Sequence, residues 1–238
     1  MHRTPVPRSR LIVCALAATW GIPALAGPPL VCHRLEIGNA RSLPWGTEST
    51  SWDQPLGDYR LAHLADDTLA LLTPETPTIV RMETMRRAAI YGERFPEGAK
   101  ELLLKLSARA HDGESQGKAG AAALFDYGYL VEVTKEVGWA YHTAEGRSGK
   151  SNVAMNLDGY PWVVRALAAS GGNSEMELAA ALIVLGRKDL QSHREHAQKA
   201  LEGGRDDALL ARNLAAFFTG AGSDTMTVLL AKAAKGGQ

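Results

Sequence analysis

The spacing of apolar residues after position 58 constrains the fold of this chain more than any other feature. In the segment 96–110, apolar residues recur at the i, i+3, i+4 and i+7 positions that line one face of an α-helix. No stretch alternates convincingly between apolar and polar residues, as a half-buried β-strand would. The sequence therefore predicts an all-α fold of irregular, repeat-like antiparallel helix hairpins. Further helices are predicted at 59–72, 77–91, 121–137, 162–169, 174–187, 193–201, 207–218 and 225–235.

Local signals support the starts of several of these helices. Thr76 and Pro77 fit an N-cap residue followed by proline at the first helical position. The Ser-x-x-Glu segments 174–177 and 192–195 fit capping boxes, in which each side chain satisfies a free backbone N–H of the other residue. The predicted helix 121–137 is apolar almost all round, so we expect it in the middle of the fold.

The first 26 residues have the organisation of a cleavable secretion signal. A basic stretch at 1–10 precedes ten mostly apolar residues at 11–20, and Ala24-Leu25-Ala26 supplies the small residues that a signal peptidase reads. The apolar stretch is too short for a membrane span and contains a proline. There is no twin-arginine pair. We therefore expect export by the general secretory route, to the periplasm or the extracellular space, with no membrane span after cleavage.

Cleavage before Gly27 would change both the charge and the cysteine content. The full chain balances 26 Lys and Arg against 26 Asp and Glu, and the signal carries three arginines and no acid, so the mature charge becomes −3. A faintly acidic protein lacks the basic surface that nucleic acids require, so we expect no nucleic-acid partner. Cys14 would leave with the signal, and the remaining Cys32 cannot form an internal disulfide.

The composition divides the chain into successive regions. A proline-rich stretch without periodicity follows the signal, and it contains Trp45 and Trp52, which we expect to pack onto the helices rather than remain solvated. The predicted regions are a signal at 1–26, an extended N-terminal arm at 27–57, a helical subdomain at 58–142, a linker loop at 143–161 and a helical-hairpin subdomain at 162–238.

Parts of the sequence resemble two kinds of known helical protein. Helix starts in the C-terminal half repeat at about 33 residues, and together with the segment Ala181-Leu182-x-x-Leu185-Gly186 this spacing resembles tetratricopeptide-type helix hairpins, without their aromatic positions. Other segments resemble exported bacterial helical proteins that have no assigned activity. That second resemblance implies no function, but it directs attention to the arm and to the Arg/Glu-rich helix. Its segments are 27–45, 67–72, 80–87 and 124–132.

The segment 144–151 fits a loose form of the phosphate-binding loop, in which Lys150 would reach phosphate oxygens and Ser151 would hold magnesium. Such a loop follows a buried strand and opens a long helix. Here it follows a predicted helix, and Gly159 and Pro161 stop any helix that starts at Ser151. We interpret the segment as an interhelical loop and expect no cofactor.

Two groups could ligate a metal. Cys32 and His33 offer soft ligands, which leaves a periplasmic metal or redox role open, but adjacent residues rarely chelate one ion and no CxxC or HxxxH partner exists. His193 and His196 lie one turn apart without the spacing of a zinc-protease motif, and we expect them to be solvated helix residues. No metal is therefore expected.

One acidic residue stands out because it lies in an apolar run. Asp126 needs a partner or a raised pKa if it is buried, and the helix 77–91 could supply one from Arg81, Glu83, Arg86 and Arg87. Glu83 lies three and four positions before Arg86 and Arg87, so part of this set can satisfy itself. A structural ion network is the favoured interpretation. The alternative is a small hydrolytic or lyase-type enzyme that uses Asp126 and Glu83 in a helical cleft.

The chain therefore shows amphipathic helices without a coherent catalytic set. The leading hypothesis is an exported, non-enzymatic helical protein that acts as a scaffold or binding module for an unidentified protein or peptide. The candidate binding residues are Cys32, His33, Trp45, Arg81, Glu83, Arg86 and Asp126.

Overall fold

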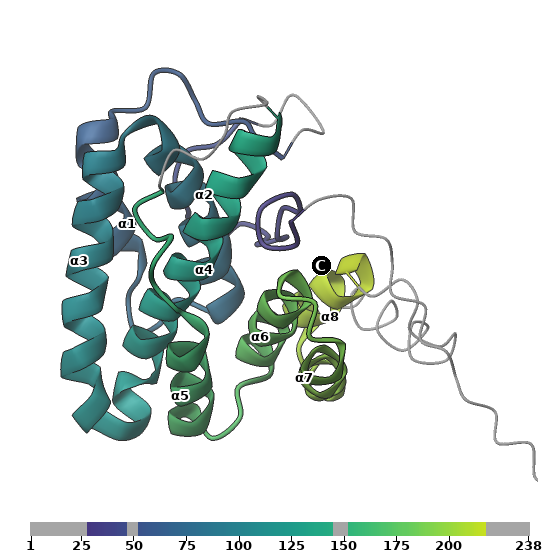
Figure 1. The fold of residues 1–238 in the computed structure, drawn as a ribbon. Helices are drawn as coiled ribbons and strands as arrows, with labels where there is room; N and C mark the ends of the chain where they lie inside the picture. Colours follow the sequence, from purple (N-terminus) through teal and green to yellow (C-terminus); the bar gives the residue numbers. More distant parts are fainter. Residues whose placement is uncertain (1–27, 47–51, 145–151, 218–238) are drawn as a thin grey trace, which may run out of the picture.

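The all-α prediction is confirmed by the computed structural model, which describes residues 28–46, 52–144 and 152–217 (Figure 1). Within these ranges there are eight α-helices and two 3-10 helices, and no strand. The predicted signal, most of the phosphate-loop-like segment and the predicted helix 225–235 lie outside the described residues. The helices are η1 (Leu61–His63), α1 (Leu64–Leu71), α2 (Thr78–Arg94), α3 (Pro96–Gly113), η2 (Glu114–Gly120), α4 (Ala121–Ala144), α5 (Tyr160–Ser170), α6 (Ser174–Gly186), α7 (Leu190–Gly203) and α8 (Ala208–Phe217).

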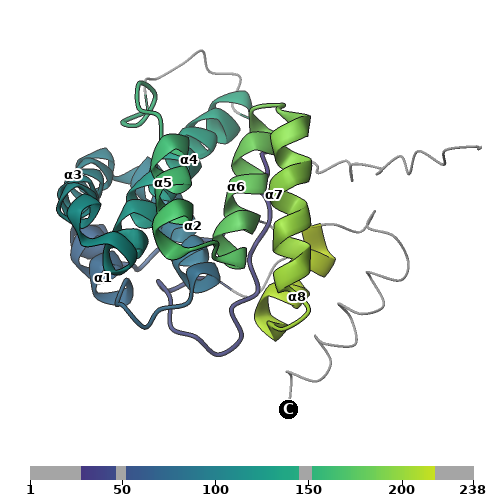
Figure 2. The ribbon, with the colours of Figure 1, turned by 90° about the horizontal axis from the view of Figure 1, so that it is seen from below.

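Helices α2 and α4 form the middle of the molecule. They pack against each other, α1 and α3 cover one side of the pair, and α6, α7 and α8 lie on the other side (Figures 1 and 2). The central position of α4 agrees with its apolar sequence, since Phe125, Tyr129 and Val133 have no exposed surface. In the described part of the chain, no helix combines the length and apolar character needed to cross a membrane.

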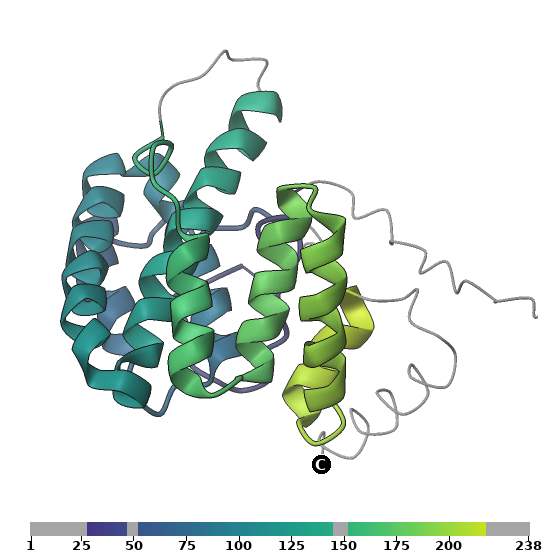
Figure 3. The ribbon, with the colours of Figure 1, turned by 60° about the horizontal axis from the view of Figure 1, so that its bottom comes forward.

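Helices α5, α6 and α7 lie side by side in one row (Figure 3). The pair α6–α7 forms the predicted hairpin, but neither predicted capping box occurs. Asn173 caps α6 by accepting the amide of Met176, and Asp189 caps α7 by accepting the amide of Ser192. Asparagine and aspartate are strong N-cap residues. Asn173 lies one position before Ser174 and Asp189 three positions before Ser192, so both helices begin earlier than the capping-box pattern predicts.

The first helices also differ from the predicted boundaries. Pro77, not Thr76, occupies the N-cap position of α2, and the Thr76 hydroxyl instead donates to the carbonyl of Leu71 in the preceding turn. The segment between the predicted helices 96–110 and 121–137 contains the 3-10 helix η2, which is interrupted at Gly117, whose φ of 55° is left-handed. Helix α4 extends to Ala144 and so includes the start of the predicted linker.

The junction between α4 and α5 depends on two glycines. An added Cβ on Gly128 would lie 2.6 Å from the carbonyl oxygen of Gly159, and one on Gly159 would lie within 3.0 Å of the Gly128 carbonyl carbon and the Val131 Cβ. The two backbones therefore approach more closely than any side chain would allow. This contact joins α5 to the helices that precede it, although the sequence assigns α5 to the C-terminal region.

The N-terminal arm is non-helical at 28–46 and 52–60 and is built into the core. Around Leu35 and Glu36 it passes between α2 and α8 (Figures 1 and 2). Leu30, Val31, Leu35 and Leu43 are each at most 5% exposed, so the arm contributes apolar packing between the two groups of helices.

Candidate functional site

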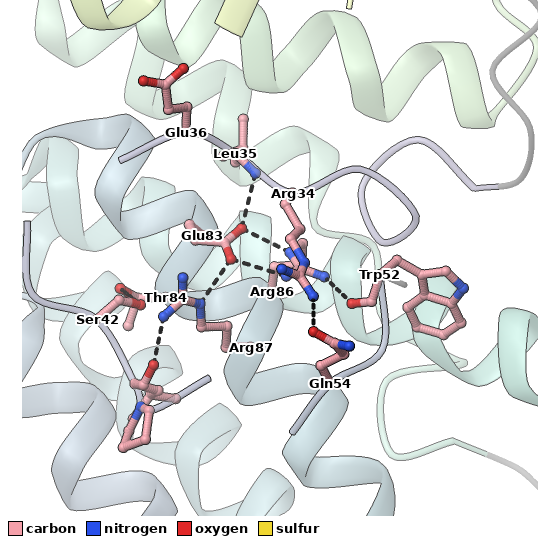
Figure 4. A network of polar contacts seen from close by, with 12 residues as sticks. Arg34, Leu35, Glu36, Ser42, Trp52, Gln54, Glu83, Thr84, Arg86 and Arg87 are labelled. Carbon is pink, nitrogen blue, oxygen red and sulfur yellow. Dashed lines mark hydrogen bonds and ion pairs between the residues drawn. The ribbon is translucent and has the colours of Figure 1, made fainter. Parts of the chain in front are cut away.

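The arm is held at its centre by the carboxylate of Glu83 on α2 (Figure 4). This side chain has no exposed surface. Its oxygens lie 2.8 Å from the Nε atoms of both Arg86 and Arg87, and Oε2 accepts the main-chain amide of Leu35 at 3.1 Å. Because residues three and four positions apart share a helix face, α2 brings both guanidinium groups to one carboxylate.

The two arginines determine the charge state of Glu83. Burial raises the pKa of its carboxyl, but the attraction and hydrogen bonds of Arg86 and Arg87 outweigh burial and leave the pKa below its usual value. Glu83 is therefore held as a carboxylate, the form that accepts the Leu35 amide.

The same arginines hold carbonyl groups of the arm. Arg86 is fully buried, and its Nη1 donates to the carbonyl oxygens of Val31 and Trp52, each at 3.1 Å. Arg87 donates from Nη1 to the carbonyl of Leu43 at 2.7 Å. One guanidinium thus joins two stretches of arm that are separated in the sequence.

On the opposite side, α8 holds the arm through Asn213. The side-chain oxygen of Asn213 accepts the amide of Glu36 at 2.9 Å, and its Nδ2 donates to the Glu36 carbonyl at 2.9 Å. One amide side chain therefore binds both main-chain groups of one arm residue. Arg212 adds an ion pair to the Glu36 carboxylate at 2.9 Å.

Trp45 lies where the arm passes the middle of α2. Its ring meets the ring of Tyr91 edge-on, with 5.7 Å between centroids, and the guanidinium carbons of Arg86 and Arg87 lie 5.1 and 5.7 Å from its centroid. The Tyr91 hydroxyl donates to the carbonyl of Pro44 at 2.7 Å and accepts the Leu56 amide at 3.0 Å.

The start of the described arm is held by Glu136 on α4, whose Oε2 accepts the amide of Leu30 at 2.8 Å. Burial raises the pKa of Glu136 to about 8, and repulsion from Glu132 adds to this, against the opposing effects of the Leu30 amide and Lys135. In contrast to Glu83, this carboxyl has no guanidinium partner among its described contacts, so the neutral form is favoured at neutral pH.

These contacts share one chemical property: helix side chains bind the main chain of a non-helical segment. Such bonds do not depend on which side chains the segment carries, whereas the buried leucines supply apolar fit. The helices therefore hold the chain's own arm largely through its main chain.

Cys32 and His33 belong to the same arm but have other surroundings. Cys32 is a free, partly exposed thiol, and burial raises its pKa, with Glu136 adding to the shift and Arg86 opposing it. The His33 ring meets Phe217 edge-on at 5.6 Å, and burial lowers its pKa. No cluster of three or more potential metal-ligating side chains occurs among the described residues.

Arg81 and Asp126 form a separate, buried ion pair, with 2.6 Å between Nη1 and Oδ2. Arg81 also donates to the carbonyls of Thr73 and Thr76. Burial raises the pKa of Asp126 to about 6, because its one direct arginine partner only partly offsets the loss of hydration. Asp126 pairs with Arg81 and Glu83 with Arg86 and Arg87, and no described hydrogen bond or ion pair joins the two carboxylates.

The sequence analysis missed several residues of this site. Asn213 is a polar residue that is 1% exposed inside an apolar helix, and that position is a usable signal for a buried hydrogen-bonding role. Glu136 gives no such signal, because the helix face it occupies becomes clear only when the arm is placed.

Comparison with known proteins adds no relative from which a role could be transferred. No protein-family model, no curated protein and no solved structure matches this chain.

Proposed function

We propose that this chain is an exported helical module that binds a protein partner along its N-terminal arm, a role that involves no catalysis at that surface. The observation that supports this most is the network around Glu83, in which buried side chains of α2 hold the main chain of an extended arm. Because the main chain of the arm is already ordered, it loses little further conformational entropy when a partner lies along it.

The surface that would receive the partner is the outer side of the arm, next to α8. Residues 38–41 are exposed, and Glu36 is bound to α8 through its main chain and through Arg212. A partner that lies along this stretch would contact the arm and the helix at once.

A photo-crosslinking residue at position 41 tests this proposal. Arg41 is exposed on the arm, whereas Leu104, on the outer helix α3, is 62% exposed and serves as a matched control for non-specific apolar contact. We expect a discrete crosslinked protein at position 41 in periplasmic extract, and the same protein should bind the purified chain. Identical crosslinking patterns at positions 41 and 104 would contradict the proposal.

Export itself is tested separately. N-terminal sequencing of the protein recovered from outside the cytoplasm should begin at Gly27, since Ala24-Leu25-Ala26 precedes it. Recovery of only the uncleaved chain from the cytoplasm would contradict this part of the proposal.

A further inference from the structure

A hydroxyl, an imidazole and a carboxylate lie in line where α5, α6 and α7 meet. The hydroxyl of Tyr160, at the start of α5, lies 2.9 Å from Nε2 of His196 on α7. The other ring nitrogen, Nδ1, lies 2.5 Å from Oε2 of Glu177 on α6. The prediction that His193 and His196 are solvated is therefore wrong, because His193 is buried and only 13% of the His196 side chain is exposed. The three side chains come from three helices that form one row, so the packing of that row sets their geometry.

The direction of the hydrogen bonds follows from the chemistry of the three groups. An ionised carboxylate can only accept, so Glu177 orients the imidazole with its proton on Nδ1. Nε2 of the neutral ring then presents a lone pair, and Tyr160 donates its proton to it. This is the order in which a carboxylate and a histidine activate a hydroxyl nucleophile in acyl transfer.

We propose that Tyr160 is a nucleophilic site for activated carboxylic esters, with His196 as its general base and Glu177 as the residue that positions His196. The side chains of Tyr160 and His196 are both partly exposed, so this group of residues lies at the surface of the row that α5, α6 and α7 form. The inference is independent of peptide binding at the arm, since none of these residues contacts the arm in the contacts described above.

The reaction balances without any further reactant. The phenol oxygen attacks the acyl carbon, the phenol proton moves to Nε2 of His196, and the ester C–O bond breaks. The alcohol leaving group then takes that proton from His196, and the acyl group remains as an ester on Tyr160. Water that attacks this ester with help from His196 regenerates the phenol and releases the acid.

The surrounding charges indicate which substrates fit. Burial raises the pKa of Tyr160, and Asp189, Glu177 and Glu195 add to the shift while Arg187 opposes it. The phenol is therefore neutral at rest and depends on His196 for activation. Arg187 lies 5.2 Å from the centroid of the Tyr160 ring and Lys199 lies 3.5 Å from Glu177, so cations partly balance the acids near the phenol. An uncharged ester is therefore the expected class.

The test uses p-nitrophenyl acetate and the purified full chain. The expected result is a burst of p-nitrophenolate with the acetyl group on Tyr160, located by mass spectrometry of proteolytic peptides. Tyr160→Phe should abolish that label, and His196→Gln should slow labelling by at least about tenfold. Glu177→Gln should slow it by a similar factor, since the imidazole loses the group that fixes its tautomer.

Tyr59 provides a matched control. Its hydroxyl donates to a carboxylate, Asp67, at 2.8 Å, but it has no imidazole partner. Tyr59→Phe should leave labelling unchanged. Within the unsubstituted protein, Tyr160 should acquire the acetyl group faster than Tyr59, a comparison that needs no variant and so does not depend on variant folding.

Two outcomes would overturn the proposal. One is an acetyl group spread over lysines and tyrosines without preference for Tyr160. The other is an unchanged labelling rate in folded His196→Gln, which would assign to Tyr160, His196 and Glu177 only the role of joining three helices.

Discussion

The main-chain amide of Leu35 donates to the fully buried carboxylate of Glu83, 3.1 Å away. The same carboxylate binds two guanidinium groups that in turn hold three carbonyl groups of the arm. A segment without secondary structure is therefore part of the core, because the helices satisfy its backbone polar groups.

Removing the charge of Glu83 tests how much this network contributes. In Glu83→Gln, two buried guanidinium groups lose their counter-charge, and we expect a loss of about 3 kcal/mol in the free energy of unfolding, measured with urea. The control is Asp66→Asn, which breaks the exposed contact between Asp66 and Lys105 and should leave stability unchanged within error. Equal effects of the two substitutions would contradict the central role of Glu83.

Glu136 predicts a dependence of stability on pH. Its folded-state pKa of about 8 lies above the ordinary carboxyl pKa of the unfolded chain. The contribution of Glu136 to the free energy of unfolding is therefore fully present below the ordinary carboxyl pKa, and it is lost as the pH rises through about 8. Glu136→Gln keeps an acceptor for the Leu30 amide and cannot ionise. Because the side chain keeps some exposure, we expect the variant to gain about 2 kcal/mol relative to the unsubstituted chain between pH 5 and pH 9. A constant difference across that range would contradict the prediction.

The Arg81–Asp126 pair leads to a second prediction about stability and pH. As for Glu136, the raised pKa of Asp126 means that the free energy of unfolding falls as the pH rises. The folded-state pKa of Asp126 is raised to about 6, so its neutral form predominates at pH 5 and its carboxylate at pH 7. Arg81→Leu leaves that carboxylate buried without a cation. The expected loss is about 3 kcal/mol at pH 7 and clearly less at pH 5, measured by chemical unfolding. An equal loss at pH 5 and pH 7 would contradict this prediction and would show that Arg81 acts mainly through its bonds to the carbonyls of Thr73 and Thr76.

The close approach of α4 and α5 predicts a steric effect. In Gly128→Ala, the new Cβ would lie 2.6 Å from the Gly159 oxygen and 2.9 Å from the Trp162 Cβ. We expect a loss of about 2 kcal/mol in thermal or chemical unfolding. Gly57→Ala is the control, because nothing lies within 4 Å of an added Cβ there, and it should leave stability nearly unchanged.

Periodicity predicts the helices of this fold well, because each α-helix must turn an apolar face toward the core. The segment 96–110 falls inside α3, and the apolar run 121–137 falls inside the central helix α4. Start signals are less reliable where several cap residues stand close together. At both α6 and α7, an upstream Asn or Asp takes the position that the pattern assigns to a serine.

The sequence predicts the contacts of the candidate site less completely than it predicts the helices. The i, i+3 and i+4 spacing predicts the contacts of Glu83 with Arg86 and Arg87, because those residues lie on one helix. The contacts with Leu35 and Asn213 join segments that are distant in the sequence. No local pattern encodes them, and the arm has no periodicity from which to derive its path.

Hydrogen exchange at the amide of Leu35 tests most directly whether the helices hold the arm as a bound peptide. In the unsubstituted chain this amide should exchange orders of magnitude more slowly than in an unstructured peptide, and Glu83→Gln should accelerate it while amides in the middle of α4 remain protected. Exchange of Leu35 at the unstructured rate in the unsubstituted chain would contradict the account.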